Sequence, residues 1–185
     1  FKREARPTEK EILSSRLTDR PLRPLFPEGF NNETRLDINV VSYDEVNEPD
    51  VFAALGASFA LSLSDIPFNG PIASVRVGRV DDELIMNPTK EQMLESDYDL
   101  VLSGSKESIV MVEGKCEFVS EDDVLMAIQY GHEGIKELVQ LQEDLLSEMK
   151  VVKRDVPLKE VNEDLNKSID KLVDGKISSL NEPKD

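Results

Sequence analysis

The sequence predicts an α/β fold of the α+β type, in which a mixed β-sheet packs in layers with helices and an all-helical segment follows. Capping signals precede long stretches whose apolar residues recur three or four positions apart, which indicates helices packed on a core. Other stretches alternate apolar and polar residues, as strands with one buried face do. The two patterns follow one another without strict strand–helix alternation, and this order favours an α+β or mixed layer fold.

The N-terminal part contains one predicted helix and one predicted strand. Thr8 and Glu11 fit a capping box, since each can accept a hydrogen bond from the backbone N–H of the other. A helix is therefore expected over about Glu9–Asp19. Pro21 is expected to end it, because proline lacks the N–H that a further turn needs. Leu36–Ser42 is rich in β-branched residues and nearly alternating, so a strand is expected there.

The middle of the chain predicts a helix followed by a hairpin. Asp50–Leu63 is apolar and rich in small residues, which indicates a buried helix. Gly56 lowers helix stability, so close packing is the expected reason for its presence. Ile72–Val80 alternates and turns at Asp81-Asp82 into Glu83–Met86, which predicts two antiparallel strands.

The remaining elements are predicted by the same signals. They are a short helix from Thr89 to Leu94, two antiparallel strands at Tyr98–Ser103 and Ser108–Val112, and a long helix at Glu121–Met149 that Ser120 caps. From Val151 the composition changes. A linker at Lys153–Pro157 leads into a polar helix over Leu158–Leu180, whose thin apolar stripe needs a packing partner.

Charge, hydropathy and cysteine content limit the function classes. The net charge of −16 argues against nucleic acid, but residues 1–30 carry seven Lys and Arg against five Asp and Glu. Such a basic patch can attract a polyanion locally, although it could equally only solvate a helix. The longest apolar stretch, Val51–Leu63, is shorter than the roughly 20 residues of a membrane span. The lone Cys116 excludes an internal disulfide, so a reducing, cytoplasmic compartment is expected.

A series of short strings occurs in a fixed order along the chain: Phe1–Glu4, Arg16–Phe30, Ile66–Ile72, Val75–Gly78, Asn87–Thr89, Met111–Glu113 and Gly131–Glu133. In this order and spacing they resemble the bacterial polynucleotide phosphorylase family. The resemblance implies two parts. Residues 1–150 resemble the family's first RNase-PH-like core domain without its N-terminal part, and residues 151–185 resemble the start of its helical linker domain.

The resemblance implies that the parent protein is a phosphate-dependent 3′-to-5′ exoribonuclease, a polyribonucleotide nucleotidyltransferase that degrades RNA to nucleoside diphosphates in mRNA turnover. It implies single-stranded RNA as substrate, inorganic phosphate as co-substrate, a homotrimeric ring, RNA degradosome components as candidate partners, and no membrane. Mg²⁺ is expected in a second core domain and not in this segment. The alternatives are a non-catalytic RNA-binding ring subunit of an exosome-like complex, or an isolated fragment without activity.

The resemblance further implies that this copy is not catalytic. In the family's catalytic copy a Ser-rich turn at a helix start cradles phosphate, and an Asp, an Asp and a Lys complete the site. Gly56–Ala60 stands at the turn here and is expected to be a packing turn. Met93, Asp99 and Val101 stand at the other positions. Met is a poor ligand for Mg²⁺ and Val carries no charge, so Asp99 is expected to be a polar residue at a strand end and the segment to be inactive alone.

RNA contacts are a separate expectation. Phe1, Lys2 and Arg3 resemble a loop that lines the pore of the family's ring, where an aromatic ring stacks on bases and cations meet phosphates. The alternative is a frayed terminus without contacts. Arg16 and Arg20 lie four positions apart on one helix face and resemble a pair that contacts the RNA backbone.

The alternative for these two arginines is pairing with Asp19 or Glu28. His132 is expected to be a structural hydrogen-bonding residue, and Cys116 has no neighbouring histidine in the sequence to activate it.

Overall fold

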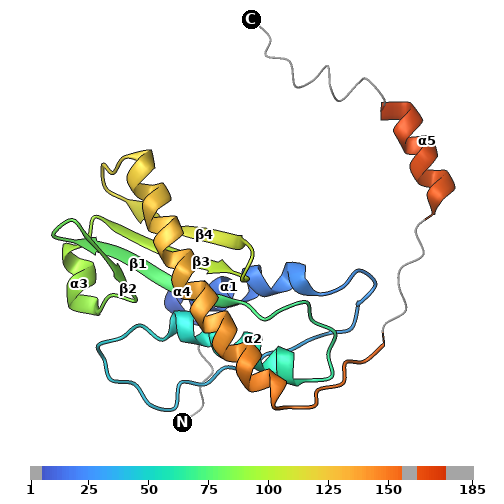
Figure 1. Ribbon diagram of the computed structural model, residues 1–185, viewed down its shortest axis with the longest axis horizontal. Coiled ribbons are helices and arrows are strands. Elements are labelled where there is room, and N and C mark those ends of the chain that lie inside the picture. The colour runs from blue at the N-terminus through green and yellow to red at the C-terminus, as the bar shows by residue number, and fades with distance from the viewer. Residues whose placement is uncertain (1–5, 156–161, 174–185) are drawn as a thin grey trace, which may run out of the picture.

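The computed structural model describes residues 6–155 and 162–173. Within them the helices are α1 (Glu9–Leu22), α2 (Asp50–Leu63), α3 (Lys90–Glu95), α4 (Glu121–Ser147) and α5 (Glu163–Val173) (Figure 1). The strands are β1 (Ala73–Val80), β2 (Glu83–Met86), β3 (Tyr98–Gly104) and β4 (Ile109–Cys116). A short 3-10 helix, Arg23–Leu25, follows α1 directly.

The strands form one sheet in the order β2-β1-β3-β4. Asp81 and Asp82 join β1 to β2 with φ angles of 51° and 62°, which give the left-handed turn that suits a two-residue hairpin. Each described strand pair is antiparallel, where a mixed sheet was expected. The predicted α+β class is confirmed.

Helix α4 covers one face of the sheet (Figure 1). Its buried Ala127, Ile135 and Val139 pack with side chains of β1 and β3 in the main apolar cluster. Gly131 lies at a close approach to the sheet, where an added Cβ would be 2.3 Å from Cδ1 of Leu102. The helix can therefore rest directly on the sheet because residue 131 has no side chain.

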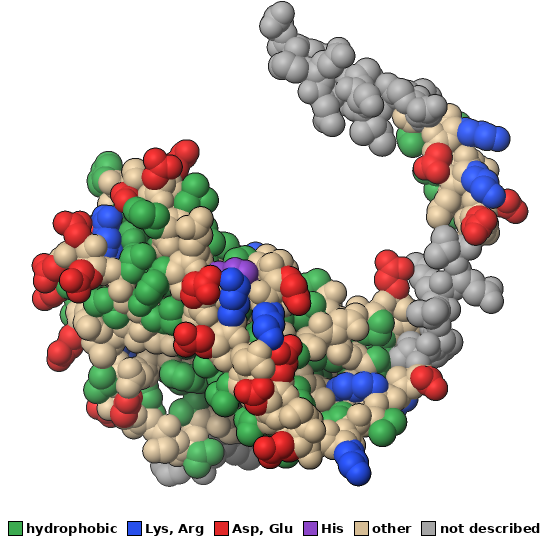
Figure 2. All heavy atoms as spheres, viewed as in Figure 1, with side chains coloured by type: hydrophobic (Ala, Val, Ile, Leu, Met, Phe, Trp, Pro, Cys, Tyr) green, Lys and Arg blue, Asp and Glu red, His purple; other side chains and the backbone are tan. Residues whose placement is uncertain are grey.

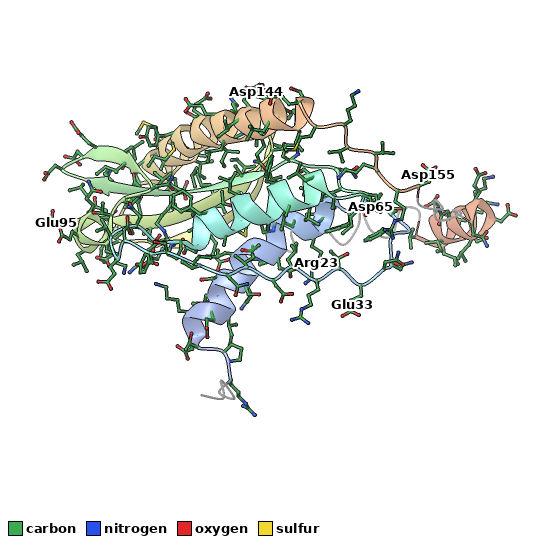
Figure 3. All side chains as sticks on the ribbon, turned by 90° about the horizontal axis from the view of Figure 1, so that it is seen from below. Arg23, Glu33, Asp65, Glu95, Asp144 and Asp155 are labelled. Atoms are coloured by element: carbon green, nitrogen blue, oxygen red, sulfur yellow. The ribbon has the colours of Figure 1, made fainter. Side chains whose placement is uncertain are left out.

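Helices α2 and α1 cover the opposite face (Figure 3). Val51 of α2 packs with Val101 of β3 and Met111 of β4, and Leu17 of α1 joins this cluster. Since successive strand residues point to opposite faces, β3 contributes to both apolar layers. The core thus consists of the sheet between α4 on one side and the α1–α2 pair on the other.

The predicted end of the first helix was wrong. Helix α1 continues through Pro21 to Leu22. Proline removes one backbone hydrogen bond near the end of the helix. Pro21 and Leu22 are both buried, with Leu22 only 2% exposed, and their burial offsets that loss.

The predicted strand at Leu36–Ser42 was also wrong, because this segment has no regular secondary structure. Its apolar side chains are exposed, with Ile38 at 46% and Val41 at 96%. An alternating sequence becomes a strand only where another strand pairs with it. None of the described strands pairs with these residues.

The other predicted elements are confirmed within one or two residues at most ends, and β4 is longer than expected. The hydroxyl of Thr8 accepts from the Glu11 N–H, that of Thr89 from the Gln92 N–H, and that of Ser120 from the Asp123 N–H. The helix expected over Leu158–Leu180 includes α5, and its two ends lie outside the described residues. No helix of residues 6–155 and 162–173 is long and apolar enough to cross a membrane.

The segment after α4 is anchored to the C-terminal end of α2. The Lys153 ammonium group donates to the backbone carbonyls of Leu61, Ser62 and Ser64 at 2.8, 2.9 and 2.9 Å. Arg154 pairs with Asp65 at 2.6 Å. Burial lowers the pKa of Lys153, and Asp65 partly opposes this shift. A cation at this end of a helix satisfies carbonyls that lack a partner within the helix and favours the helix dipole.

Replacing Lys153 with Met should therefore destabilise the chain. Met keeps most of the aliphatic stem but donates no hydrogen bond, so three carbonyls at the end of α2 lose their donor. We expect the free energy of unfolding to fall by about 1–2 kcal/mol in urea denaturation. The matched control is Lys150→Met at an exposed position nearby. Equal effects of the two variants would show that Lys153 does not cap α2.

Candidate nucleic-acid interface

The two candidate RNA-binding arginines are carried by α1. The capping box fixes the start of this helix, since the Thr8 N–H donates to Glu11 Oε2 at 2.7 Å. Arg16 and Arg20 follow one turn apart and are both exposed. The first turns of α1 stand out from the rest of the domain in Figure 3.

The two arginines differ in their surroundings. Arg20 Nη1 forms an ion pair with Glu113 of β4, a partner 93 positions away for which the sequence offers no signal. Arg16 has no hydrogen bond or ion pair with any other residue of the described ranges. Asp19 pairs with Arg23. The structure thus brings Arg20 to Glu113, and leaves Arg16 as an open cation.

The other three candidates cannot be placed. Phe1, Lys2 and Arg3 lie outside the described residues. Their expected contact with RNA therefore stays a prediction. Figure 2 shows acidic side chains spread over the face that carries α4, which makes that face a poor surface for a polyanion.

A hollow of about 480 Å³ lies beside α1, between α3 and the sheet. Its wall includes Lys10, Lys90, Asp50, Arg76, Met93 and Asp99. Glu48 pairs with Lys10 at 2.7 Å. Tyr43 lies against Lys90, whose Nζ is 4.8 Å from the centroid of the tyrosine ring, and this contact raises the pKa of Lys90.

The three residues expected to match the family's catalytic positions are distributed over this wall and the core. Met93 and Asp99 line the hollow. Val101 is 5% exposed and belongs to the apolar cluster below α2. Asp99 is more than a polar residue at a strand end, because its carboxylate accepts from Arg76 Nη1.

Arg76 is a charged residue of this wall that the sequence did not predict as part of a site. Its Nη2 donates to Asp50 Oδ2 at 2.5 Å while its Nη1 contacts Asp99. The available signal was an arginine inside the alternating apolar strand Ile72–Val80, since a charge on a core-facing strand requires a buried partner.

Gly56–Ala60 does not form the expected packing turn, because it lies inside α2. Backbone N–H groups in a helix interior are already hydrogen-bonded, so they cannot cradle a phosphate. Ser58 is completely buried, and its Oγ accepts from the Ile72 N–H at 2.9 Å. The segment therefore joins α2 to the start of the sheet.

Two family models match this chain. The "3′ exoribonuclease family, domain 1" covers residues 1–67, and the "3′ exoribonuclease family, domain 2" covers residues 70–134. The chain belongs to the 3′ exoribonuclease family.

Curated relatives agree with this assignment. A polyribonucleotide nucleotidyltransferase of Geotalea uraniireducens is 52% identical over 169 residues, which cover 91% of this chain and 24% of the relative. One of Gemmatimonas aurantiaca is 49% identical over 185 residues, which cover 100% of this chain and 25% of the relative. The chain spans about a quarter of the length of these relatives.

A solved structure shares the fold. Rice (Oryza sativa) Rrp46 superposes with a TM-score of 0.61 at 15% sequence identity, covering 77% of this chain and 68% of that chain. At this identity the likeness supports the fold and carries no residue roles.

Met93, Asp99 and Val101, the residues expected to match the family's catalytic positions, do not fit a magnesium ion. Mg²⁺ requires hard oxygen ligands in octahedral geometry, and Met93 and Val101 offer none. The carboxylate of Asp99 is engaged by Arg76. Among the described residues there is no group of three or more His, Cys, Asp and Glu that could hold a metal ion.

The histidine and the cysteine of this chain lie away from the hollow. His132 Nε2 lies 3.2 Å from the Ser105 carbonyl oxygen, which links α4 to the loop after β3 and confirms its expected structural hydrogen bond. Cys116 is free and exposed at the end of β4. Neither residue belongs to the hollow.

The 185-residue chain alone should not phosphorolyse RNA. We expect no release of nucleoside diphosphates from poly(A) in the presence of phosphate and Mg²⁺, because neither the metal ligands nor the phosphate cradle are present at the matching positions. Chromatography of the nucleotide products measures this directly, with a complete family enzyme as the positive control. Phosphate-dependent product formation by the pure chain would contradict the assignment.

Proposed function

We propose that this chain is the first, non-catalytic RNase-PH-like copy of a polyribonucleotide nucleotidyltransferase, followed by the start of a helical linker. The observation that carries the proposal is similarity at about half identity to relatives of that name over nearly the whole chain. The matched catalytic positions, held by Met93, Asp99 and Val101, support a non-catalytic role for this copy.

In the proposed reaction of the parent protein, a phosphate oxygen attacks the phosphorus of the 3′-terminal phosphodiester. The bond to the 3′ oxygen of the preceding nucleotide breaks, and a nucleoside diphosphate leaves the shortened RNA. Mg²⁺ and the co-substrate phosphate are assigned to a second core domain. The homotrimeric ring, a cytoplasmic location and contact with degradosome components are further predictions that rest on the family resemblance.

The part of this chain in that activity is to hold single-stranded RNA. Guanidinium groups form charge-assisted hydrogen bonds with phosphate oxygens, and they do so independently of base sequence. Arg16 is exposed and has no partner in the described part of the chain, so it can take a phosphate without breaking an existing pair. Arg20 has further donors besides the Nη1 that contacts Glu113.

The rival function is a non-catalytic ring subunit of an exosome-like complex. It shares the RNA-binding role and the inactive site. The relatives that match at about half identity are polyribonucleotide nucleotidyltransferases four times as long as this chain, and this favours the enzyme. A second RNase-PH-like copy downstream in the same reading frame would decide between the two.

Replacing Arg16 and Arg20 together with Ala in the complete parent protein should weaken binding to all single-stranded RNA sequences. Each lost phosphate contact should flatten the dependence of log affinity on log salt concentration by about 0.7. Binding of labelled poly(A) at several salt concentrations measures both effects. Arg35→Ala removes an exposed arginine outside α1 and serves as the matched control.

The Glu113→Gln variant separates RNA binding from a purely structural role. If Arg20 serves only as the partner of Glu113, then R20A and E113Q should lower the melting temperature equally and leave RNA affinity unchanged. If Arg20 contacts RNA, E113Q should maintain or strengthen binding, because it removes a negative charge that competes with phosphate. An unchanged salt dependence in R16A/R20A would contradict the proposed contact.

A further inference from the structure

A buried ion network joins three elements at the wall of the hollow. Arg76 of β1 lies between Asp50, the first residue of α2, and Asp99 of β3. The side chains of Arg76, Asp50 and Asp99 are 12%, 9% and 28% exposed. The two carboxylates come from different elements and converge on one guanidinium group.

We propose that Arg76 acts as a built-in substitute for a metal ion, so that its guanidinium both neutralises Asp50 and Asp99 and excludes a divalent cation from them. Mg²⁺ retains several waters and is bound by proteins through as few as one or two carboxylates, so two carboxylates that converge at the wall of a hollow are enough ligands for such an ion. Here the guanidinium group of Arg76, which carries one positive charge, lies between the two carboxylates.

Charge, more than hydrogen-bond geometry, holds Arg76 in place. A guanidinium offers five donors in a rigid fork. Arg76 uses one nitrogen for each carboxylate, and its Nε is buried without an acceptor in the described structure. A complete hydrogen-bond set would make the arginine specific to this position. With Nε unpaired, the charge of the two carboxylates is the larger part of what holds Arg76 between them.

Removal of the guanidinium would leave a strongly anionic pair. Asp50 Oδ1 accepts from the Val51 N–H at 2.8 Å, so the start of α2 fixes the orientation of this carboxylate. Asp99 faces the hollow, which gives a hydrated ion a path of entry. The nearest lysines on the wall, Lys10 and Lys90, lie close to Glu48, at 2.7 and 3.8 Å. Without Arg76, the carboxylates of Asp50 and Asp99 would therefore have no cation among the described residues to neutralise them.

The test compares Mn²⁺ binding by the 185-residue chain and by its Arg76→Ala variant. Electron paramagnetic resonance measures the concentration of free Mn²⁺, and thermal melting measures the stabilisation that binding causes. We expect R76A to bind a single Mn²⁺ at concentrations on the order of 10⁻³ M, and its melting temperature to rise by several degrees with MnCl₂. The wild-type chain should show neither effect, and NaCl of equal ionic strength should not reproduce them.

Two further variants make the result specific to this network. R76K keeps one positive charge and should bind no Mn²⁺, while R76A/D99N lacks one carboxylate and should lose the binding of R76A. If R76A does not fold without metal, restoration of its helical circular dichroism by Mn²⁺ becomes the readout. A folded R76A that binds no Mn²⁺, equal binding by R76A/D99N, or a failure of Mn²⁺ to restore structure would each overturn the proposal.

Discussion

The guanidinium of Arg76 ties the start of α2 to the sheet. It contacts the first residue of α2 from β1 and reaches β3 at the same time. A buried ion pair adds little stability compared with a well-packed apolar contact, but loss of one partner costs about 3–5 kcal/mol because a buried charge is left unpaired. The network therefore restricts how α2 can sit on the sheet.

Once α2 is placed, the position of α1 follows. Leu17 packs onto the cluster of Val51, Val101 and Met111, directly beside the ion network. Arg16, the residue before Leu17, lies about 100° around the helix from this contact and is exposed to solvent. Val101, one of the three residues expected to match the family's catalytic positions, belongs to the cluster on which the arginine-bearing helix rests. A lysine in place of this valine would disrupt the cluster.

Features set by local chemistry could be predicted from the sequence. Side-chain caps at Thr8, Thr89 and Ser120 and the Asp81-Asp82 turn depend on residues close in the chain. Features set by distant contacts could not. The burial that carries α1 through Pro21, and the missing partner that leaves Leu36–Ser42 without a strand, are properties of the assembled domain.

The candidate site likewise has a part that the sequence predicted and a part that it did not. The sequence pointed to Arg16 and Arg20 through a resemblance, and their spacing placed them on one helix face. It gave no sign of Glu113, which lies 93 positions from Arg20, or of the two acids that meet at Arg76 from 26 and 23 positions away. Strand register and helix packing determine which residues pair across such separations, and neither can be predicted from a single sequence.

In the function proposed above, this copy binds RNA along α1 and does no chemistry in the hollow. Photo-crosslinking of thiouridine-labelled single-stranded RNA to the complete parent protein, with the crosslinked peptides identified by mass spectrometry, tests it most directly. We expect crosslinks within residues 9–22 and none within the peptides that carry Met93 and Asp99. Crosslinks confined to the peptides of the hollow, with α1 unlabelled, would contradict the account.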